Sequence, residues 1–331
     1  MNILVVRTDK LGDFITALPA MYLLKQHNPQ NRIIACVAPL NKELALACGF
    51  IDEVIVDDNS GTPRAFVASL GHMWNLVKKL RHVEIDASIT LFSNTRIALS
   101  QFLAGIPMRI APATKIAQIF YTHKVKQRRS EVKMAEFEYN LELTKTLFPD
   151  INLEYKKPLL EFSDSKDVYV KFCKEFNIMK EVIAFHVGFG GSSDANWNLD
   201  EYEILIREVL NQDKYRVVLT FGPDEVALCE EMKIRLKNEK VIFYISKEGI
   251  VNFAKLISHF KLFVSTSTGT YHLASLVGCP TLTFFADTLF ASSKRWKGVG
   301  DEKLQKHFMI PHAECERNKL FDYILEKLKT T

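Results

Sequence analysis

The chain has 331 residues, of which 47% are hydrophobic and 25% are charged, and its formal net charge is +4. These values are typical of a globular protein of about two domains, and the charge is too small to indicate a nucleic-acid partner by itself. No stretch approaches the roughly 20 apolar residues that cross a bilayer, and the short apolar run at 2–6 is unlike a signal peptide.

Apolar strands alternate with helical stretches through the first half of the chain. We expect strands at 3–6, 33–39, 53–58 and 87–93, and helices at 14–27, 41–48, 64–82 and 131–147. Continuous apolar strands separated by helices are typical of a parallel sheet that is covered on both faces. Pro149 and the polar residues after it interrupt this pattern, which predicts a first domain at 1–155 and a second at 156–331.

The second half repeats the alternation. We expect helices at 166–177, 200–211, 224–236, 249–258 and 267–278, and strands at 182–190, 216–222, 241–245, 262–266 and 281–286, the last strand of the chain. The pattern predicts an α/β protein with two Rossmann-like halves and a cleft between them. Ligands in such sheets bind beyond the carboxyl ends of the strands, so the loops there are the places to seek chemistry.

The six cysteines form no C-x-x-C pair. They predict reduced, buried side chains in a cytoplasmic protein rather than a disulfide framework or a zinc site.

The first such loop lies in "VVRTDKLGDFITALPA" at 5–20. A dinucleotide site would show G-x-G-x-x-G here, and its absence disfavours an NAD-dependent oxidoreductase. The segment holds Arg7, Lys10 and Asp13 around a single glycine, Gly12, which we expect to form a tight turn. From the residues alone, Asp13 is most simply the N-cap of the helix at 14–27.

Three stretches of the second half favour an anionic ligand. The glycine-rich loop at 188–198 is either an anion-binding nest or a plain surface loop. The hydroxyl residues at 265–270 open a helix, where free N–H groups and the helix dipole favour a diphosphate, although a simple helix cap is the alternative. Glu225 opens another helix and would either bind ribose hydroxyls or complement the helix dipole.

Residues 115–133 carry six Lys and Arg residues against one acid, Glu131. Arginines suit the capture of carboxylates and phosphates, whereas a solvated charged face is the simpler interpretation. Phe120 and Tyr121 within this stretch also allow contact with a membrane surface or with single-stranded nucleic acid, but no nucleic-acid motif accompanies them.

Several stretches together resemble glycosyltransferase family 9, the heptosyltransferases of the lipopolysaccharide core. The matching segments are "RTDKLGDFITALPA" at 7–20, "NTRIALSQFLAGIPMRI" at 94–110, "HVGFGGSSDANWNLDEYEILI" at 186–206, "FGPDE" at 221–225 and "STSTGTYHLASLVGCPTLTFF" at 265–285. The resemblance implies a GT-B fold, in which an N-terminal Rossmann-like domain binds the acceptor and a C-terminal one binds the nucleotide sugar. One option for the final helix is to pack back on the N-terminal domain.

The resemblance also implies an inverting transfer of heptose from ADP-heptose to a sugar of the lipopolysaccharide inner core, with Asp13 as the general base. No cofactor and no metal are implied, and no D-x-D motif follows a strand. The donor-binding residues expected by resemblance are Gly188, Gly190, Gly191, Ser192, Asn196, Glu225, Ser267, Thr268, Gly269, Thr270 and His272. The acceptor-binding residues expected in the same way are Arg7, Lys10, Gly12, Asn94, Arg128, Arg129 and Lys133.

The implied partners are a nucleotide sugar, a lipid A–core acceptor and the anionic cytoplasmic surface of the inner membrane, on which the enzyme would be peripheral. No nucleic acid is implied. His272 has a second interpretation, as a side chain that only packs.

Two positions depart from the family pattern. Ala195 stands where close relatives have a lysine that pairs with the donor phosphates, and Ser267 stands where many have an aspartate. Arg7, Lys10 and Lys294 are candidates for the compensating charge. The departures motivate one alternative, a related transferase with another nucleotide sugar or glycan acceptor. An alternative of another class is a non-catalytic nucleotide-sugar-binding protein.

Overall fold

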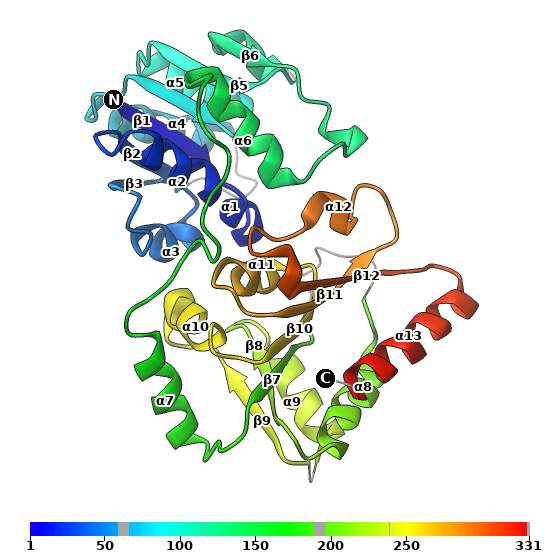
Figure 1. The fold of residues 1–331 in the computed structure, drawn as a ribbon. Coiled ribbons are helices and arrows are strands. Elements are labelled where there is room, and N and C mark those ends of the chain that lie inside the picture. The colour runs from blue at the N-terminus through cyan, green and yellow to red at the C-terminus, as the bar shows by residue number, and fades with distance from the viewer. Residues whose placement is uncertain (59–65, 115, 189–195, 238, 330–331) are drawn as a thin grey trace. The chain divides into compact units, whose positions relative to one another are not determined.

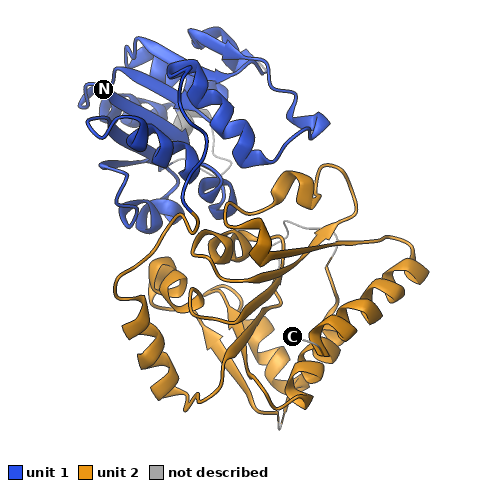
Figure 2. Ribbon diagram, viewed as in Figure 1, with its two compact units in different colours: residues 1–156 blue, residues 157–331 orange. Residues whose placement is uncertain are grey.

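The computed structural model describes residues 1–58, 66–114, 116–188, 196–237 and 239–329. The chain divides into two compact units, Met1–Lys156 and Lys157–Thr331 (Figure 2). Each unit is built around its own six-stranded sheet with helices on both faces (Figure 1).

In unit 1 the sheet is parallel and has the strand order β3-β2-β1-β4-β5-β6. Its strands are β1 (Asn2–Arg7), β2 (Arg32–Val37), β3 (Glu53–Val56), β4 (Ala87–Thr90), β5 (Met108–Pro112) and β6 (His123–Val125). Its α-helices are α1 (Leu11–Ile15), α2 (Leu18–His27), α3 (Lys42–Leu46), α4 (Phe66–Arg81), α5 (Thr95–Leu103) and α6 (Glu136–Leu147). The short 3-10 helices are η1 (Pro39–Asn41), η2 (Ile116–Phe120) and η3 (Arg129–Glu131).

Unit 2 repeats this plan with the order β12-β11-β10-β7-β8-β9, again all parallel. Its strands are β7 (Val182–His186), β8 (Arg216–Phe221), β9 (Val241–Ile245), β10 (Leu262–Thr266), β11 (Thr281–Ala286) and β12 (Gln305–Ile310). Its helices are α7 (Ser165–Glu175), α8 (Leu199–Asn211), α9 (Val226–Arg235), α10 (Gly249–Ile257), α11 (Gly269–Leu276), α12 (Ser293–Trp296), η4 (Glu302–Leu304) and α13 (Glu314–Lys329).

The central strands are buried on both faces, as their continuous apolar sequences predict. Every residue of β1 from Ile3 to Arg7 is buried, and so is every residue of β7, β10 and β11. Helices must therefore cover both faces of each sheet, which requires the right-handed crossovers of a doubly wound fold. The direction in which successive strands are added to the sheet reverses between β1 and β4 in unit 1 and between β7 and β10 in unit 2. Such switch points are where ligands bind in open α/β sheets.

The helix expected at 14–27 is two helices, and this changes the position of Asp13. Pro19 lies in the first turn of α2, where its missing N–H costs nothing. The preceding helix, α1, ends at Ile15 and begins at Leu11, with Lys10 at the N-cap position. Asp13 is thus inside α1, so the prediction that it caps the helix is wrong.

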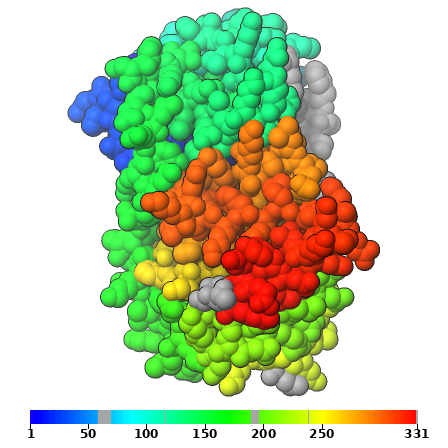
Figure 3. Space-filling view, turned by 45° about the vertical axis from the view of Figure 1, so that its right-hand side comes forward, coloured from blue at the N-terminus to red at the C-terminus, as the bar shows by residue number. Residues whose placement is uncertain are grey.

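Other boundaries also differ from the sequence pattern. The long helix expected from residue 131 begins at Glu136, because Val132 has a left-handed backbone with a φ of 46°. The strand at 281–286 is not the last, since β12 pairs with it along its whole length. Two strands of unit 1, β5 and β6, were also missed by the pattern. The final helix, α13, packs on α8 within unit 2 (Figure 3).

Candidate functional site

A buried arginine marks the carboxyl end of β1, at the switch point of unit 1. The Arg7 side chain is only 2% exposed, and its guanidinium group donates to three carboxylates. Nε lies 2.8 Å from Asp9 Oδ1, Nη2 lies 2.5 Å from Asp13 Oδ1, and Nη1 lies 3.4 Å from Glu136 Oε1. The three acids come from the β1–α1 loop, from α1 and from the first residue of α6. One cation therefore joins three separate segments of unit 1.

A second arginine completes this network. Arg129 Nη1 donates to Glu136 Oε1, and Arg129 also donates to Gln127 and Asn140. Asn140, four residues further along α6, donates to the carbonyl of Thr16 at 3.0 Å. The N-terminal half of α6 is thereby tied to the C-cap residue of α1. We call the two arginines and three carboxylates the Arg7 network; it contains Arg7, Arg129, Asp9, Asp13 and Glu136.

Asp13 is an acid of this network whose pKa is strongly perturbed. Burial raises the pKa of its carboxyl from 3.8 to about 6, against the opposing effect of the Arg7 cation. The negative charges of Asp9 and Glu136 add to the increase. With three acids and two arginines, the fully ionised network carries one excess negative charge, and protonation of Asp13 removes it. A carboxyl with a pKa near 6 at a sheet switch point suits proton transfer near neutral pH.

The contacts of Asp13 leave one of its oxygens available. Oδ1 accepts from Arg7, whereas the structure shows no hydrogen bond to Oδ2 from any residue it describes. The side chain is 19% exposed, so it is reachable from solvent although it is mostly buried. Arg7 therefore orients the carboxylate without occupying both of its oxygens.

The other residues expected to bind the acceptor fall into two groups. Arg7 and Arg129 are held by carboxylates inside the unit, whereas Arg128 and Lys133 are exposed and both pair with Glu131. Lys10 is also exposed.

Two more of these residues have local structural roles. The Asn94 side chain caps α5 by accepting from Ile97 N at 2.9 Å. Gly12 is helical, as the second residue of α1, so the expected tight turn at this position is wrong.

In unit 2, a histidine and a glutamate meet where β7 and β8 end. His186 is the last residue of β7 and is buried, with Nδ1 2.9 Å from the carbonyl of Thr220. Its Nε2 lies 3.8 Å from Glu225 Oε2, and Glu225 also accepts from Gly222 N at 2.6 Å. Burial lowers the pKa of His186, although the nearby Glu225 charge opposes this. His186 was missed by sequence analysis, because a histidine inside an apolar strand carries no recognisable signal.

Gly188 is close-packed against Glu225. A Cβ atom added to Gly188 would lie 1.8 Å from Glu225 Oε1, far inside van der Waals contact. Only glycine allows the backbone after β7 to approach this carboxylate so closely. The predicted residues Gly188 and Glu225 are therefore adjacent in the structure.

The switch point of unit 2 also carries hydroxyl groups after β10. Thr268 occupies the N-cap position of α11 but its side chain does not cap the helix; its Oγ1 lies 2.8 Å from Thr270 Oγ1. The first N–H groups of a helix have no partner within the helix, so those of Gly269 and Thr270 need an external acceptor. Ser267 N donates to the carbonyl of Phe284.

Two buried polar atoms beside this helix start have no partner among the described residues. These are Thr266 Oγ1, at the end of β10, and His272 Nδ1, in the first turn of α11. Burial lowers the pKa of His272 to about 4, and the neighbouring His307 adds to this effect. His272 is therefore neutral near pH 7. Buried polar atoms without partners are uncommon and indicate a missing hydrogen-bonding group, such as a ligand or water.

The remaining predictions for the donor site have different outcomes. The Asn196 side chain accepts from Tyr202 Oη at 2.9 Å, so its amide oxygen is used by α8. Gly190, Gly191 and Ser192 lie outside the described residues, as does Ala195. Lys294, one candidate for compensating charge, is exposed on α12, whereas Arg7 is held in its network.

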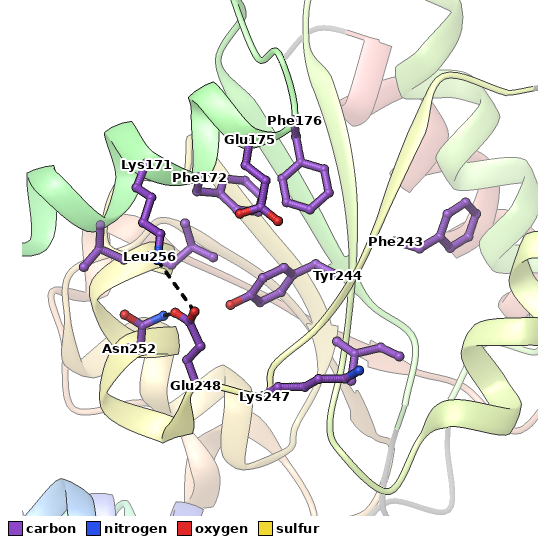
Figure 4. A pocket seen from close by; sticks show the side chains of 12 residues that line it. Lys171, Phe172, Glu175, Phe176, Phe243, Tyr244, Lys247, Glu248, Asn252 and Leu256 are labelled. Atoms are coloured by element: carbon purple, nitrogen blue, oxygen red, sulfur yellow. Dashed lines mark hydrogen bonds and ion pairs between the residues drawn. The ribbon is translucent and has the colours of Figure 1, made fainter.

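A pocket of about 420 Å³ opens elsewhere on unit 2, between α7, β9 and α10 (Figure 4). Tyr244 points into it, and Lys171 and Glu248 face each other across it at 3.8 Å. None of the predicted site residues lines this pocket. It is thus separate from the switch point.

Comparisons with known proteins agree with these features. The model of glycosyltransferase family 9 (heptosyltransferase) matches residues 73–321. A candidate glycosyltransferase of Haemophilus influenzae is 36% identical over 313 residues, which cover 92% of this chain and 88% of that protein.

Two solved structures share the fold. The E. coli ADP-heptose lipopolysaccharide heptosyltransferase II matches with a TM-score of 0.78 and 18% identity over 100% of both chains. The E. coli heptosyltransferase WaaC with ADP-2-deoxy-2-fluoro heptose matches with a TM-score of 0.72 and 18% identity, over 99% of this chain and 100% of that one. These matches confirm the predicted GT-B fold.

The raised pKa of Asp13 predicts a specific dependence of stability on pH. Between about pH 4 and pH 6 the folded protein keeps a proton that the unfolded chain releases. The stabilisation from this proton is complete below pH 4 and is lost as the pH rises through 6. Asp13→Asn lacks this titration, so its free energy of unfolding should increase relative to the wild type between pH 4 and pH 7, by on the order of 2–3 kcal/mol.

Urea unfolding of both proteins at pH 4, 5.5 and 7 measures this difference. Glu84→Gln, which neutralises an exposed acid of the same unit, is the control and should show a much smaller change. A constant difference between Asp13→Asn and the wild type across this range would contradict the raised pKa.

Proposed function

This chain belongs to glycosyltransferase family 9, the heptosyltransferases, and from that premise we propose that it transfers heptose from ADP-heptose to the inner core of lipopolysaccharide with inversion at the anomeric carbon. It is an enzyme of the glycosyltransferase class. The names of its structural neighbours motivate the donor and the acceptor, since one is an ADP-heptose lipopolysaccharide heptosyltransferase and another holds an ADP-heptose analogue.

The proposal depends mainly on the position and acidity of Asp13. In an inverting transfer a base removes the proton of the acceptor hydroxyl, whose oxygen then bonds to the anomeric carbon as the bond to the diphosphate breaks. Asp13 Oδ2 would take this proton, while Arg7 holds Oδ1. The pKa of about 6 keeps Asp13 mostly ionised at pH 7 and still basic enough to accept a proton.

The Arg7 network would serve Asp13 rather than bind substrate. Arg7 keeps Asp13 in one orientation, and Glu136 and Asp9 share the arginine so that its charge does not fully suppress the basicity of Asp13. This role would replace the acceptor contact that the family resemblance implies for Arg7 and Arg129. Arg128 and Lys133, which are exposed, remain the candidates for the anionic groups of the acceptor.

The leaving diphosphate would bind in unit 2 at the start of α11. The N–H groups of Gly269 and Thr270 favour an anion, and the unpartnered Thr266 Oγ1 and His272 Nδ1 can supply further hydrogen bonds. Glu225, held beside Gly188, would accept from the ribose hydroxyls. These N–H and hydroxyl groups offset negative charge without a metal, in keeping with the metal-independent mechanism that the family resemblance implies.

The acceptor places the reaction at the cytoplasmic face of the inner membrane, where the enzyme would be peripheral. Within the described residues the structure contains no helix long and apolar enough to cross a bilayer. Two rival functions differ in donor and in chemistry. One is a family-9 transferase for another nucleotide sugar or glycan, favoured by Ala195 and Ser267; the other is a nucleotide-sugar-binding protein without turnover.

The first test replaces the proposed base. Asp13→Asn keeps the size of the side chain but cannot take a proton, so kcat should fall by roughly 10²–10⁴-fold, while the Kd for ADP-heptose stays within about twofold. Initial rates with delipidated core acceptor and calorimetric donor titrations measure the two quantities.

Asp9→Asn is the matched control, because Asp9 also bonds to Arg7 but through Nε. It should lose less than about tenfold in kcat, since a neutral Asp9 leaves the proposed base in place. Wild-type turnover by Asp13→Asn would show that Asp13 is not the base. Equal losses in both variants would show that Asp13 has no role in turnover beyond that of the other carboxylates of the network.

The second test separates the donors. Calorimetric titration with ADP-heptose, ADP-glucose, and UDP- and GDP-linked sugars should give the lowest Kd for ADP-heptose. A lower Kd for any other donor would favour the first rival. Tight donor binding with no transfer to any acceptor would favour the non-catalytic protein.

The third test concerns the contact between Gly188 and Glu225. In Gly188→Ala the new Cβ would overlap the Glu225 carboxylate and displace it, so the Kd for ADP should rise roughly tenfold through lost hydrogen bonds. Gly49→Ala, where an added Cβ meets no atom within 4 Å, is the control and should bind ADP as the wild type does. Unchanged ADP binding in Gly188→Ala would remove Glu225 from the donor site.

A further inference from the structure

Unit 1 exposes a group of large apolar side chains on two adjacent elements. Ile116 and Ile119 on η2 are 71% and 64% exposed, and Phe102 near the end of α5 is 50% exposed. Side chains three residues apart eclipse each other in a 3-10 helix, so the two isoleucines lie side by side. The helices α5 and η2 pack together, and the rings of Phe102 and Phe120 lie 5.7 Å apart. We call these four residues, Phe102, Ile116, Ile119 and Phe120, the η2 face.

Contacts with the rest of unit 1 hold the η2 face in position. Arg109, on β5, lies with its guanidinium carbon 5.5 Å from the centre of the Phe102 ring, and its Nε donates to the carbonyl of Phe120 at 2.7 Å. Tyr121, which directly follows η2, is buried and hydrogen-bonded to Ser93 at 3.0 Å. Several contacts thus hold η2 in place, although the ends of its isoleucine side chains remain exposed to water. Exposed groups of this kind mark interaction sites more often than scattered single residues do.

Two lysines follow η2 in the chain, and the first, Lys124, is the register partner of Ala111, which packs with Ala117 of η2. Lys124, in β6, and Lys126, just after it, are exposed, and no acid among the described residues pairs with either of them. Their neighbours differ, because Arg128 and Lys133 both pair with Glu131. The segment 116–126 therefore presents apolar tips beside uncompensated positive charge. That combination fits an anionic lipid surface, which takes apolar side chains below its headgroups and attracts the cations with them.

A second copy of the chain fits this surface less well. In a two-fold dimer the same patch faces itself, so the lysines of one subunit would approach those of the other. An anionic bilayer supplies the opposite charge over the whole surface.

We propose that the η2 face, with Lys124 and Lys126, docks unit 1 on anionic phospholipid bilayers. The proposal rests on the peripheral location in the proposed function and names the residues that produce it. Ile116 and Ile119 enter the headgroup region, and the lysines contact lipid phosphates. The contact needs phospholipid alone, without the lipid anchor of the acceptor.

Co-sedimentation of the full chain with vesicles tests the proposal. The wild type should bind phosphatidylglycerol vesicles that contain no lipopolysaccharide, should bind phosphatidylcholine vesicles much more weakly, and should dissociate as salt is added. Ile116→Ser/Ile119→Ser should lower the partition coefficient by roughly tenfold or more through lost apolar burial. Lys124→Glu/Lys126→Glu should lower it by at least about 30-fold and flatten its dependence on salt.

Matched variants on unit 2 serve as controls. Ile204→Ser/Ile234→Ser removes two exposed isoleucines, and Lys303→Glu/Lys306→Glu makes the same change in net charge; both should bind vesicles as the wild type does. Transfer to a delipidated core acceptor should be unchanged in Ile116→Ser/Ile119→Ser. Failure of the wild type and of every variant to transfer heptose would count against the proposed function. Vesicle binding would still test the membrane contact, because it does not require transfer.

Three outcomes would overturn the proposal. One is equal binding of wild type and η2-face variants to anionic vesicles. Another is binding only when the vesicles contain the lipid acceptor. The third is a wild-type dimer in sedimentation velocity that Ile116→Ser/Ile119→Ser dissociates, which would make the η2 face a subunit interface.

Discussion

The buried guanidinium group of Arg7 is the constraint on which the switch-point end of unit 1 depends. A lone charge at 2% exposure would be very costly, so the surrounding chain must supply opposite charge. Three carboxylates do so from three segments, and Arg129 closes the cluster through Glu136. Because the arginine stands at the end of the central strand β1, its partners are gathered at the switch point of the sheet. The buried charge of Arg7 therefore accounts both for the gathering of these side chains and for the position of Asp13.

The number of charges in this cluster explains the acidity of Asp13. Two arginines do not fully compensate three acids in this mostly buried cluster, so one acid, Asp13, retains a proton to a higher pH than usual. A carboxylate with a single strong arginine partner would instead have a lowered pKa and be a weak base. The additional acids Asp9 and Glu136 thus preserve the basicity of Asp13 while Arg7 orients it.

Unit 2 has the same strand order but a different set of side chains at its switch point. Its switch point carries a glycine, hydroxyls and a helix start in place of an ionised cluster, with the buried His186 and His272 both favouring their neutral forms. The proposed diphosphate would need hydrogen-bond donors, and the helix start after β10 offers them. The repeated strand order shows that one architecture supports both arrangements, since only the loops and strand ends differ.

The sequence by itself determined the α/β class, the two-unit plan and the central strands, because continuous apolar strands and intervening helices are local patterns. It also identified Asp13, Gly188, Glu225 and the hydroxyl residues at 265–270 as candidate site residues in the loops and helix starts that follow strands. It did not determine the break at Pro19, the late start of α6 or the edge strands β6 and β12, since these depend on backbone packing and on pairing with a distant neighbour. Only the tertiary structure brought Glu136, which is 129 residues away in the chain, and its partner Arg129 to Arg7, and His186 to Glu225. A charge network of this kind has no local pattern, because its members share only the place where the folded strands and helices end.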